Sequence, residues 1–162
     1  MITKKLIEEF DENIIKAFVQ KNSDYYLNKW KLMATTGSKI SWNWPAFLFG
    51  VFWLVYRKMY LQSFILIIAS IITSFIPFIN MIFALAIWIG LGLFGNYIYS
   101  YFTYNKLLEI KNLAKNEEEI RFLAIQKGGT SVVGVLVLIG IFILLEILFM
   151  VIIASVSSNS YY

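Results

Sequence analysis

Apolar side chains recur at helical spacing along the first 20 residues of the chain. Ile7, Phe10 and Ile14 fall on one face, and charged side chains fall on the opposite face. The pattern predicts an amphipathic helix over residues 2–20, packed on its own chain, on a membrane surface or on a partner. A second helix is predicted over residues 23–36, so that residues 1–40 form a cytoplasmic helical region.

A long uncharged tract follows. Residues 59–104 contain no charged side chain. As one helix this tract would be about 69 Å long, about twice the thickness of a bilayer core, so it must fold back. Pro77 and Asn80 favour a turn between its halves. We therefore predict a transmembrane helical hairpin with spans near 59–77 and 81–103.

The rest of the chain alternates between charged and apolar segments. Residues 105–129 predict a cytoplasmic amphipathic helix, 130–155 a third transmembrane helix and 156–162 an external tail. Lys and Arg are concentrated in the first 45 residues and in 105–129, and are absent from the hairpin turn and the tail. This distribution places the N-terminus in the cytoplasm and the C-terminus outside.

The stretch 41–58 decides the topology. Its uninterrupted apolar run is about 17 Å long as a helix, or half a hydrocarbon core. We interpret it as an interfacial or re-entrant elbow, with Trp42 and Trp44 as anchors at the headgroups and Arg57 and Lys58 at the cytoplasmic surface. The alternative is a full span, which would reverse the orientation of everything that follows.

Composition supports a membrane protein. The chain of 162 residues is 59% hydrophobic and 15% charged, with a mean hydropathy of +0.70, whereas soluble domains are about 45–50% apolar. The fold class expected is all-α: a polytopic integral membrane protein with three transmembrane helices, the elbow and the cytoplasmic helices. The net charge of +4 is too small to indicate nucleic-acid binding. The absence of Cys and His argues against the commonest zinc sites and thiol chemistry, and we expect no metal or cofactor.

Polar residues inside the predicted spans are the first candidate site. Glu146 is the one ionisable residue within a predicted span, and intramembrane carboxylates are functional candidates by default. We expect it to be neutral and turned towards Thr73 and Ser74 or towards another subunit, with Asn96 nearer the inner side.

Small residues in the second predicted span form a packing stripe. Gly90, Gly92, Gly95 and Ser100 are expected to let another helix approach closely. Residues 90–95 also match a dinucleotide-binding pattern, but that pattern requires a strand before it, which a membrane span does not provide.

The aromatic block carries one family resemblance. Over residues 20–105 the chain resembles a bacterial family of small membrane proteins known as domain of unknown function 2628, with Pro45 where a small residue is expected. The residues that carry the resemblance are Tyr25, Tyr26, Trp30, Asn43, Trp44, Ala46, Phe47, Gly50, Trp53, Tyr56, Arg57, Lys58, Met59 and Tyr60. The resemblance implies a small bacterial membrane protein and no particular activity.

These observations favour a non-enzymatic adaptor or assembly subunit in the bacterial cytoplasmic (inner) membrane. Its expected partners are membrane lipid and either another protein or further copies of itself. The alternatives are a small channel or transporter subunit that uses Glu146 and an immunity-type membrane protein. An intramembrane enzyme is disfavoured because the predicted spans hold no paired carboxylates or His.

Overall fold

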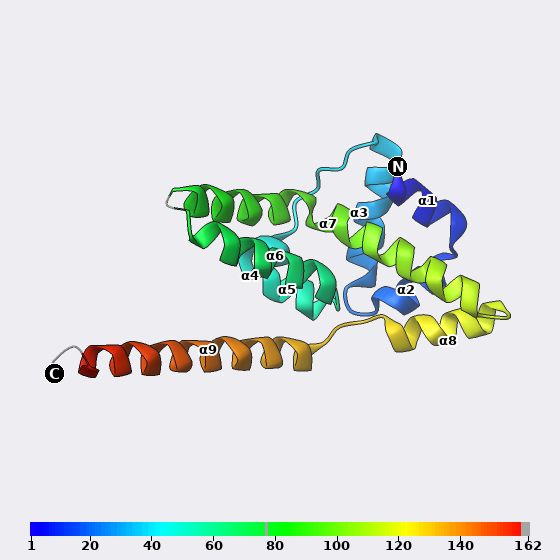
Figure 1. The fold of residues 1–162 in the computed structure, drawn as a ribbon. Helices are drawn as coiled ribbons and strands as arrows, with labels where there is room; N and C mark the ends of the chain where they lie inside the picture. Colours follow the sequence, from blue (N-terminus) through cyan, green and yellow to red (C-terminus); the bar gives the residue numbers. More distant parts are fainter. Residues whose placement is uncertain (77, 160–162) are drawn as a thin grey trace.

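The computed structural model describes residues 1–76 and 78–159, and every regular element over these residues is a helix (Figure 1). The predicted all-α fold is therefore confirmed. The helices are α1 (Ile2–Glu9), α2 (Glu12–Val19), α3 (Ser23–Thr36), α4 (Trp44–Phe49), α5 (Val51–Tyr56), α6 (Tyr60–Ser74), α7 (Ile79–Leu113), α8 (Glu117–Lys127) and α9 (Val132–Asn159).

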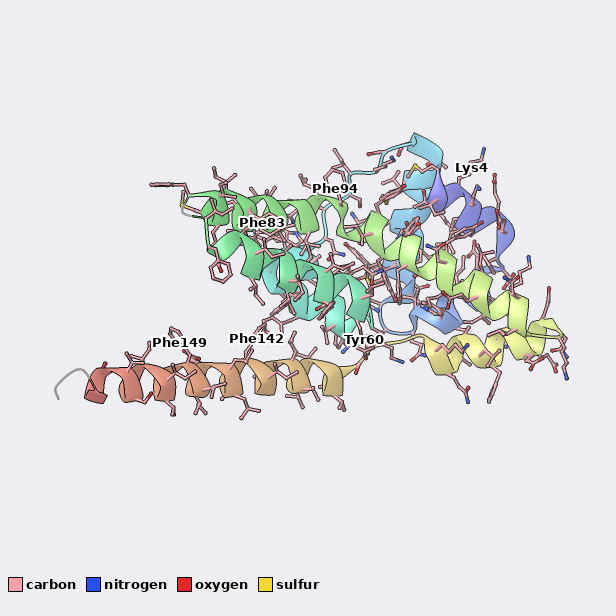
Figure 2. All side chains as sticks on the ribbon, viewed as in Figure 1. Lys4, Tyr60, Phe83, Phe94, Phe142 and Phe149 are labelled. Atoms are coloured by element: carbon pink, nitrogen blue, oxygen red, sulfur yellow. The ribbon has the colours of Figure 1, made fainter. Side chains whose placement is uncertain are left out.

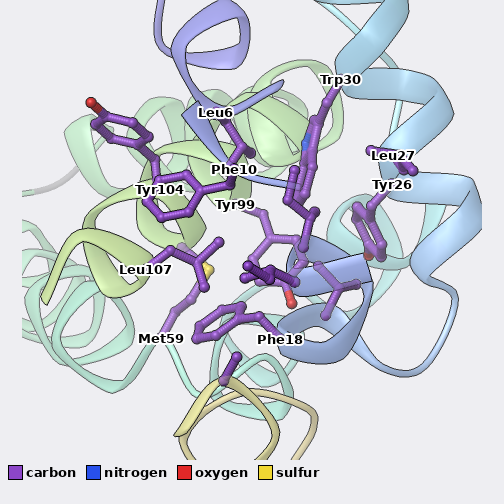
Figure 3. Packing of buried hydrophobic residues seen from close by; sticks show 14 of the residues in the cluster. Leu6, Phe10, Phe18, Tyr26, Leu27, Trp30, Met59, Tyr99, Tyr104 and Leu107 are labelled. Atoms are coloured by element: carbon purple, nitrogen blue, oxygen red, sulfur yellow. The ribbon is translucent and has the colours of Figure 1, made fainter. Parts of the chain in front are cut away.

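The first three helices fold around the second half of α7. α1 packs on α3 and α7, and α2 packs on α8 and α3. The core that they share combines aliphatic and aromatic side chains (Figure 3), and its aromatic members include Phe18, Tyr26, Trp30 and Tyr99, all almost fully buried. Burying each such side chain contributes on the order of 1.5–3 kcal/mol. We call α1–α3, α8 and the second half of α7 the helical domain.

The helix predicted over residues 2–20 is broken in two. Phe10 adopts an extended conformation, and the side chain of Asp11 accepts a hydrogen bond of 2.7 Å from the Asn13 backbone N–H. Asp11 is therefore the N-cap of α2, a role that Asp fills well. The break lets α2 turn towards α8 while both helices pack on α3, which one straight helix does not allow.

The predicted elbow is a pair of short helices, of which α4 lies on α7 and α5 packs on α6 and α9. The Asn43 side chain caps α4 by accepting from the Ala46 N–H at 2.9 Å, and Pro45 occupies the first turn. Gly50 separates α4 from α5 with φ +50°, where L side chains are strained. No atom of a neighbouring helix lies within 4 Å of its Cβ position, so its role is conformational.

The apolar helices extend away from the helical domain. α6 and the first half of α7 form the predicted hairpin, and α9 runs along the same side of the molecule (Figure 1). Two stretches are long and apolar enough to cross a membrane, Ile79–Leu113 and Glu117–Ser157, which contain α7 and α9. α6 has only 15 residues, about 22 Å as a helix, so a third span is not confirmed.

Helix α7 differs from the prediction at both ends. Asn80, expected in the hairpin turn, lies in its first turn, and Pro77 lies outside the described residues. The helix continues past the predicted end near residue 103 as far as Leu113, because residues 96–113 contain no Gly or Pro. Only then does a separate helix begin, at Glu117, and the side chain of the preceding Asn116 caps it by accepting from the Glu119 N–H.

The small-residue stripe of α7 packs mainly against the elbow. A Cβ atom on Gly92 would meet the ring of Trp42 at 3.0 Å, and one on Gly95 would meet the Ala46 Cβ at 2.8 Å. Ser100 is fully buried. Gly90 was expected to pack in the same way, but nothing lies within 4 Å of its Cβ position.

Gly90 and Gly95 give a matched test of this packing within one helix. Gly95→Ala should lower the free energy of unfolding by about 1–3 kcal/mol, because neither Ala46 nor the helix backbone can yield freely. Gly90→Ala should leave it unchanged or raise it slightly, because alanine favours helix and meets open space. Thermal unfolding followed by circular dichroism in detergent measures both, and equal effects of the two substitutions would contradict the packing.

Candidate functional site

A buried pair of asparagines ties the elbow to α7. The Asn43 side-chain N–H₂ donates to the Asn96 side-chain oxygen at 2.9 Å, and both residues are fully buried. The Asn96 amide nitrogen lies within hydrogen-bonding distance of the Ser41 carbonyl and hydroxyl, at 3.2 and 3.1 Å, and of the Trp42 carbonyl. The Asn96 carbonyl accepts from the Trp30 indole at 2.8 Å. Asn96 was predicted as an intramembrane polar candidate, and its partners make it the joint between α3, the elbow and α7.

Arg57 lies inside the protein, with only 2% of its surface exposed. Its guanidinium donates to the carbonyl of Val19 at 3.3 Å and twice to that of Lys21 at 3.0 Å. It also lies over the rings of Tyr26 and Tyr99, at 4.5 and 5.1 Å from their centroids. Arg57 was predicted to hold the end of the elbow at the cytoplasmic surface, but its side chain is not an exposed anchor, because carbonyl oxygens and aromatic faces replace water around the charge.

The neighbouring lysine holds the segment that leads into α9. Lys58 donates to the carbonyl of Gly128, and the Ser131 N–H donates to the Tyr56 carbonyl at 2.8 Å. The Gly129 N–H donates to the Phe18 carbonyl at 2.6 Å. These bonds attach the α8–α9 connection to the elbow and to α2.

The two predicted tryptophan anchors differ in their environments. Trp44 is 61% exposed, which suits an interfacial side chain. Trp42 instead packs its indole on Phe47, with ring centroids 5.0 Å apart, and on Gly92. Its indole nitrogen is buried with no hydrogen-bond partner in the described part of the chain, so Trp42 serves as a packing residue.

The predicted Glu146 site is not assembled within the chain. Glu146 is exposed on α9, and none of the hydrogen bonds or ion pairs between described residues involves it. Thr73 and Ser74, its expected partners, donate to carbonyls of their own helix, at Ala69 and Ile71. The expectation of a contact between α6 and Glu146 is therefore wrong, because α9 packs chiefly on α5 and leaves Glu146 on its free length.

A family model described as "Protein of unknown function (DUF2628)" matches residues 16–106. The chain belongs to this family. The match includes Asn43, Arg57, Asn96 and Tyr99, so both buried polar clusters lie within the family's region. Neither the curated proteins nor the solved structures gave a match to the chain.

Much of the family motif therefore builds the interior rather than an exposed catalytic surface. Tyr26, Trp30, Trp53 and Arg57 all lie in the helical domain or against it, and all are buried. Sequence reasoning missed Tyr99, which contacts all four of these side chains by ring or cation–π geometry. Its position three residues after Asn96, on the same face of α7, was the available signal.

The asparagine joint predicts a specific loss of stability. Asn96→Ala removes the acceptor of Asn43 and leaves buried polar groups unpaired, which should lower the free energy of unfolding by about 1–3 kcal/mol. Asn105, on the same helix, is half-buried and makes no hydrogen bond through its side chain within the described residues. Asn105→Ala is therefore the control and should change stability by less than about 0.5 kcal/mol. Denaturant titration in detergent distinguishes the two, and equal losses would contradict the joint.

Proposed function

We propose that the chain is a non-enzymatic adaptor of the bacterial cytoplasmic membrane, which holds its helical domain at the inner surface for a protein partner. The observation that carries this proposal is that the molecule consists of two parts with different surroundings. A folded domain is continuous, through one unbroken helix, with apolar helices that have little protein around them. The buried polar groups already hold the fold together through Asn43–Asn96 and Arg57, which supports a binding role rather than catalysis.

The arrangement of the apolar helices supports a topology with three spans. The hairpin tip and the end of α9 lie on the same side of the molecule, away from the helical domain (Figure 1). Side chains project from α9 all along its length, including Phe142 and Phe149 (Figure 2). Lipid is the solvent that suits such a surface. The short α6 crosses in this topology by local thinning of the bilayer, which costs a fraction of a kcal/mol per ångström of mismatch.

The partner surface that we propose lies on α8. Ala124, Ile120 and Leu123 pack towards the core, but Phe122 is 58% exposed and Ile125 is 50% exposed. α8 lies at the opposite end of the molecule from the hairpin tip (Figure 1), so these side chains would be out of reach of the bilayer. An exposed apolar pair on a charged helix, far from lipid, favours a protein contact. Within the described residues of the single chain, Glu146 makes no hydrogen bond or ion pair, so no observation favours the channel alternative.

The topology predicts how single cysteines react, because the natural chain has none. Asn80→Cys should react with a membrane-impermeant thiol reagent in intact cells. Lys4→Cys and Lys115→Cys should react only after the cells are permeabilised. All three positions are exposed, so accessibility within the protein does not confuse the result. Labelling of Lys115→Cys from outside, with protection of Asn80→Cys, would instead favour an elbow that spans the membrane.

The α8 surface predicts a loss of partner binding. Phe122→Glu with Ile125→Glu should reduce co-purification of specific partners from mild-detergent extracts about tenfold, because both apolar anchors acquire charge. Leu32→Glu places the same charge on an exposed apolar residue of α3 and serves as the control. Quantitative mass spectrometry of the captured proteins gives the comparison. Equal capture by the double variant and the control would contradict docking on α8.

A further inference from the structure

A cavity of about 280 Å³ lies between the elbow and the first turn of α9. Its walls differ in chemistry. Tyr26, Trp53 and Arg57, all buried, line one part. Phe49, Phe52 and Val135, all apolar and at least partly exposed, line another. The cavity therefore joins a cationic interior to an apolar surface.

The positive charge on Arg57 is not balanced by a carboxylate of any described residue. None of the four ion pairs between described residues includes Arg57, and no carboxylate oxygen of these residues lies within 4.0 Å of it. Its Nε atom is buried and makes no well-formed hydrogen bond, although the Tyr99 hydroxyl lies close to the guanidinium. A buried charge is costly unless it is paired, and a bound anion would supply the missing charge.

Further positive charge lies beside the same cavity. The Lys21 ammonium is 6.0 Å from the centroid of the Tyr56 ring, and Tyr56 is another of the lining residues. Burial raises the pKa of Tyr56, but hydrogen bonds with Thr130 and Lys21 and the charges of Lys21 and Arg57 outweigh it, so the pKa lies below its ordinary value. The charges of Lys21 and Arg57 are therefore both felt at this wall of the cavity, and positive charge of this kind attracts anions.

The cavity lies where the chain enters the apolar region. Arg57 precedes the start of α6 by three residues, and Val135 is in the first turn of α9. In the membrane arrangement proposed above, on which this step rests, both positions fall at the level of the cytoplasmic headgroups. Basic pockets at that level are suited to anionic lipid heads.

We infer that this cavity binds an acidic phospholipid, with its phosphate on Arg57 and the start of an acyl chain along Phe49, Phe52 and Val135. The charge selects an anionic head over a zwitterionic one. The apolar wall selects an amphiphile over a free anion. The cavity admits a headgroup and the first part of a chain, and the remainder of the lipid lies against the exposed apolar surface of α4 and α9.

Lipid titration of the full chain in detergent tests this inference. Dioleoyl phosphatidylglycerol should form a one-to-one complex in native mass spectrometry, with an affinity at least about tenfold above that of dioleoyl phosphatidylcholine. Inorganic phosphate at the same concentration should neither bind nor displace the lipid. Equal binding of the two lipids would overturn the inference, and so would tight binding of phosphate alone. These binding measurements use the natural chain. A negative result would therefore overturn the lipid site without affecting the separate test of partner docking on α8.

A pair of neighbouring variants locates the lipid. Val135→Trp fills the cavity without touching Arg57's hydrogen bonds and should weaken phosphatidylglycerol binding about tenfold. Leu136→Trp adds the same ring at the next residue, which is exposed and does not line the cavity, and should bind as the natural chain does. Helical circular dichroism without lipid checks that both variants fold. Unchanged binding by folded Val135→Trp would overturn the site.

Discussion

The Arg57 guanidinium joins three parts of the chain that are far apart in sequence. It comes from the end of α5, donates to carbonyls at the α2–α3 turn and lies over Tyr99 of α7. That turn contains two residues with positive φ, Gln20 and Asn22, whose conformation is held by such contacts. A buried cation is tolerated only where its surroundings are ordered, so the charge makes the packing of α2, α3, α5 and α7 mutually dependent.

The two polar clusters attach opposite ends of the elbow to the rest of the protein. Asn43 and Asn96 fix its first residues to α7, and Arg57 and Lys58 fix its last residues to α2 and to the α8–α9 connection. Between them, α4 and α5 present an apolar surface that includes Trp44 and Phe49, both exposed. The elbow is thus polar where it meets the domain and apolar where the proposed membrane lies, which suits the fixed position at the bilayer surface that the proposed adaptor requires.

Sequence reasoning succeeded where the signal was local. Helical spacing and the uncharged tract predicted α3, the hairpin and α9, and Gly92 and Gly95 were correctly expected to lie at a close contact. It failed where tertiary partners decide the outcome. The charge-distribution rule treats Arg57 as a surface residue, because the carbonyls and rings that surround it come from distant segments. The α1–α2 break and the free position of Glu146 likewise depend on which helices pack together, and periodicity does not specify that.

The unbroken course of α7 has a mechanical consequence. Its 35 residues form a rod of about 52 Å that passes from the apolar hairpin into the helical domain. The elbow packs on this rod near Asn96, and the part from there to Leu113 is about 26 Å long. Because α1, α2, α3 and α8 all pack on that part, the hairpin and the helical domain share one rigid element. In the proposed membrane arrangement, a tilt of the hairpin would therefore carry the whole helical domain with it.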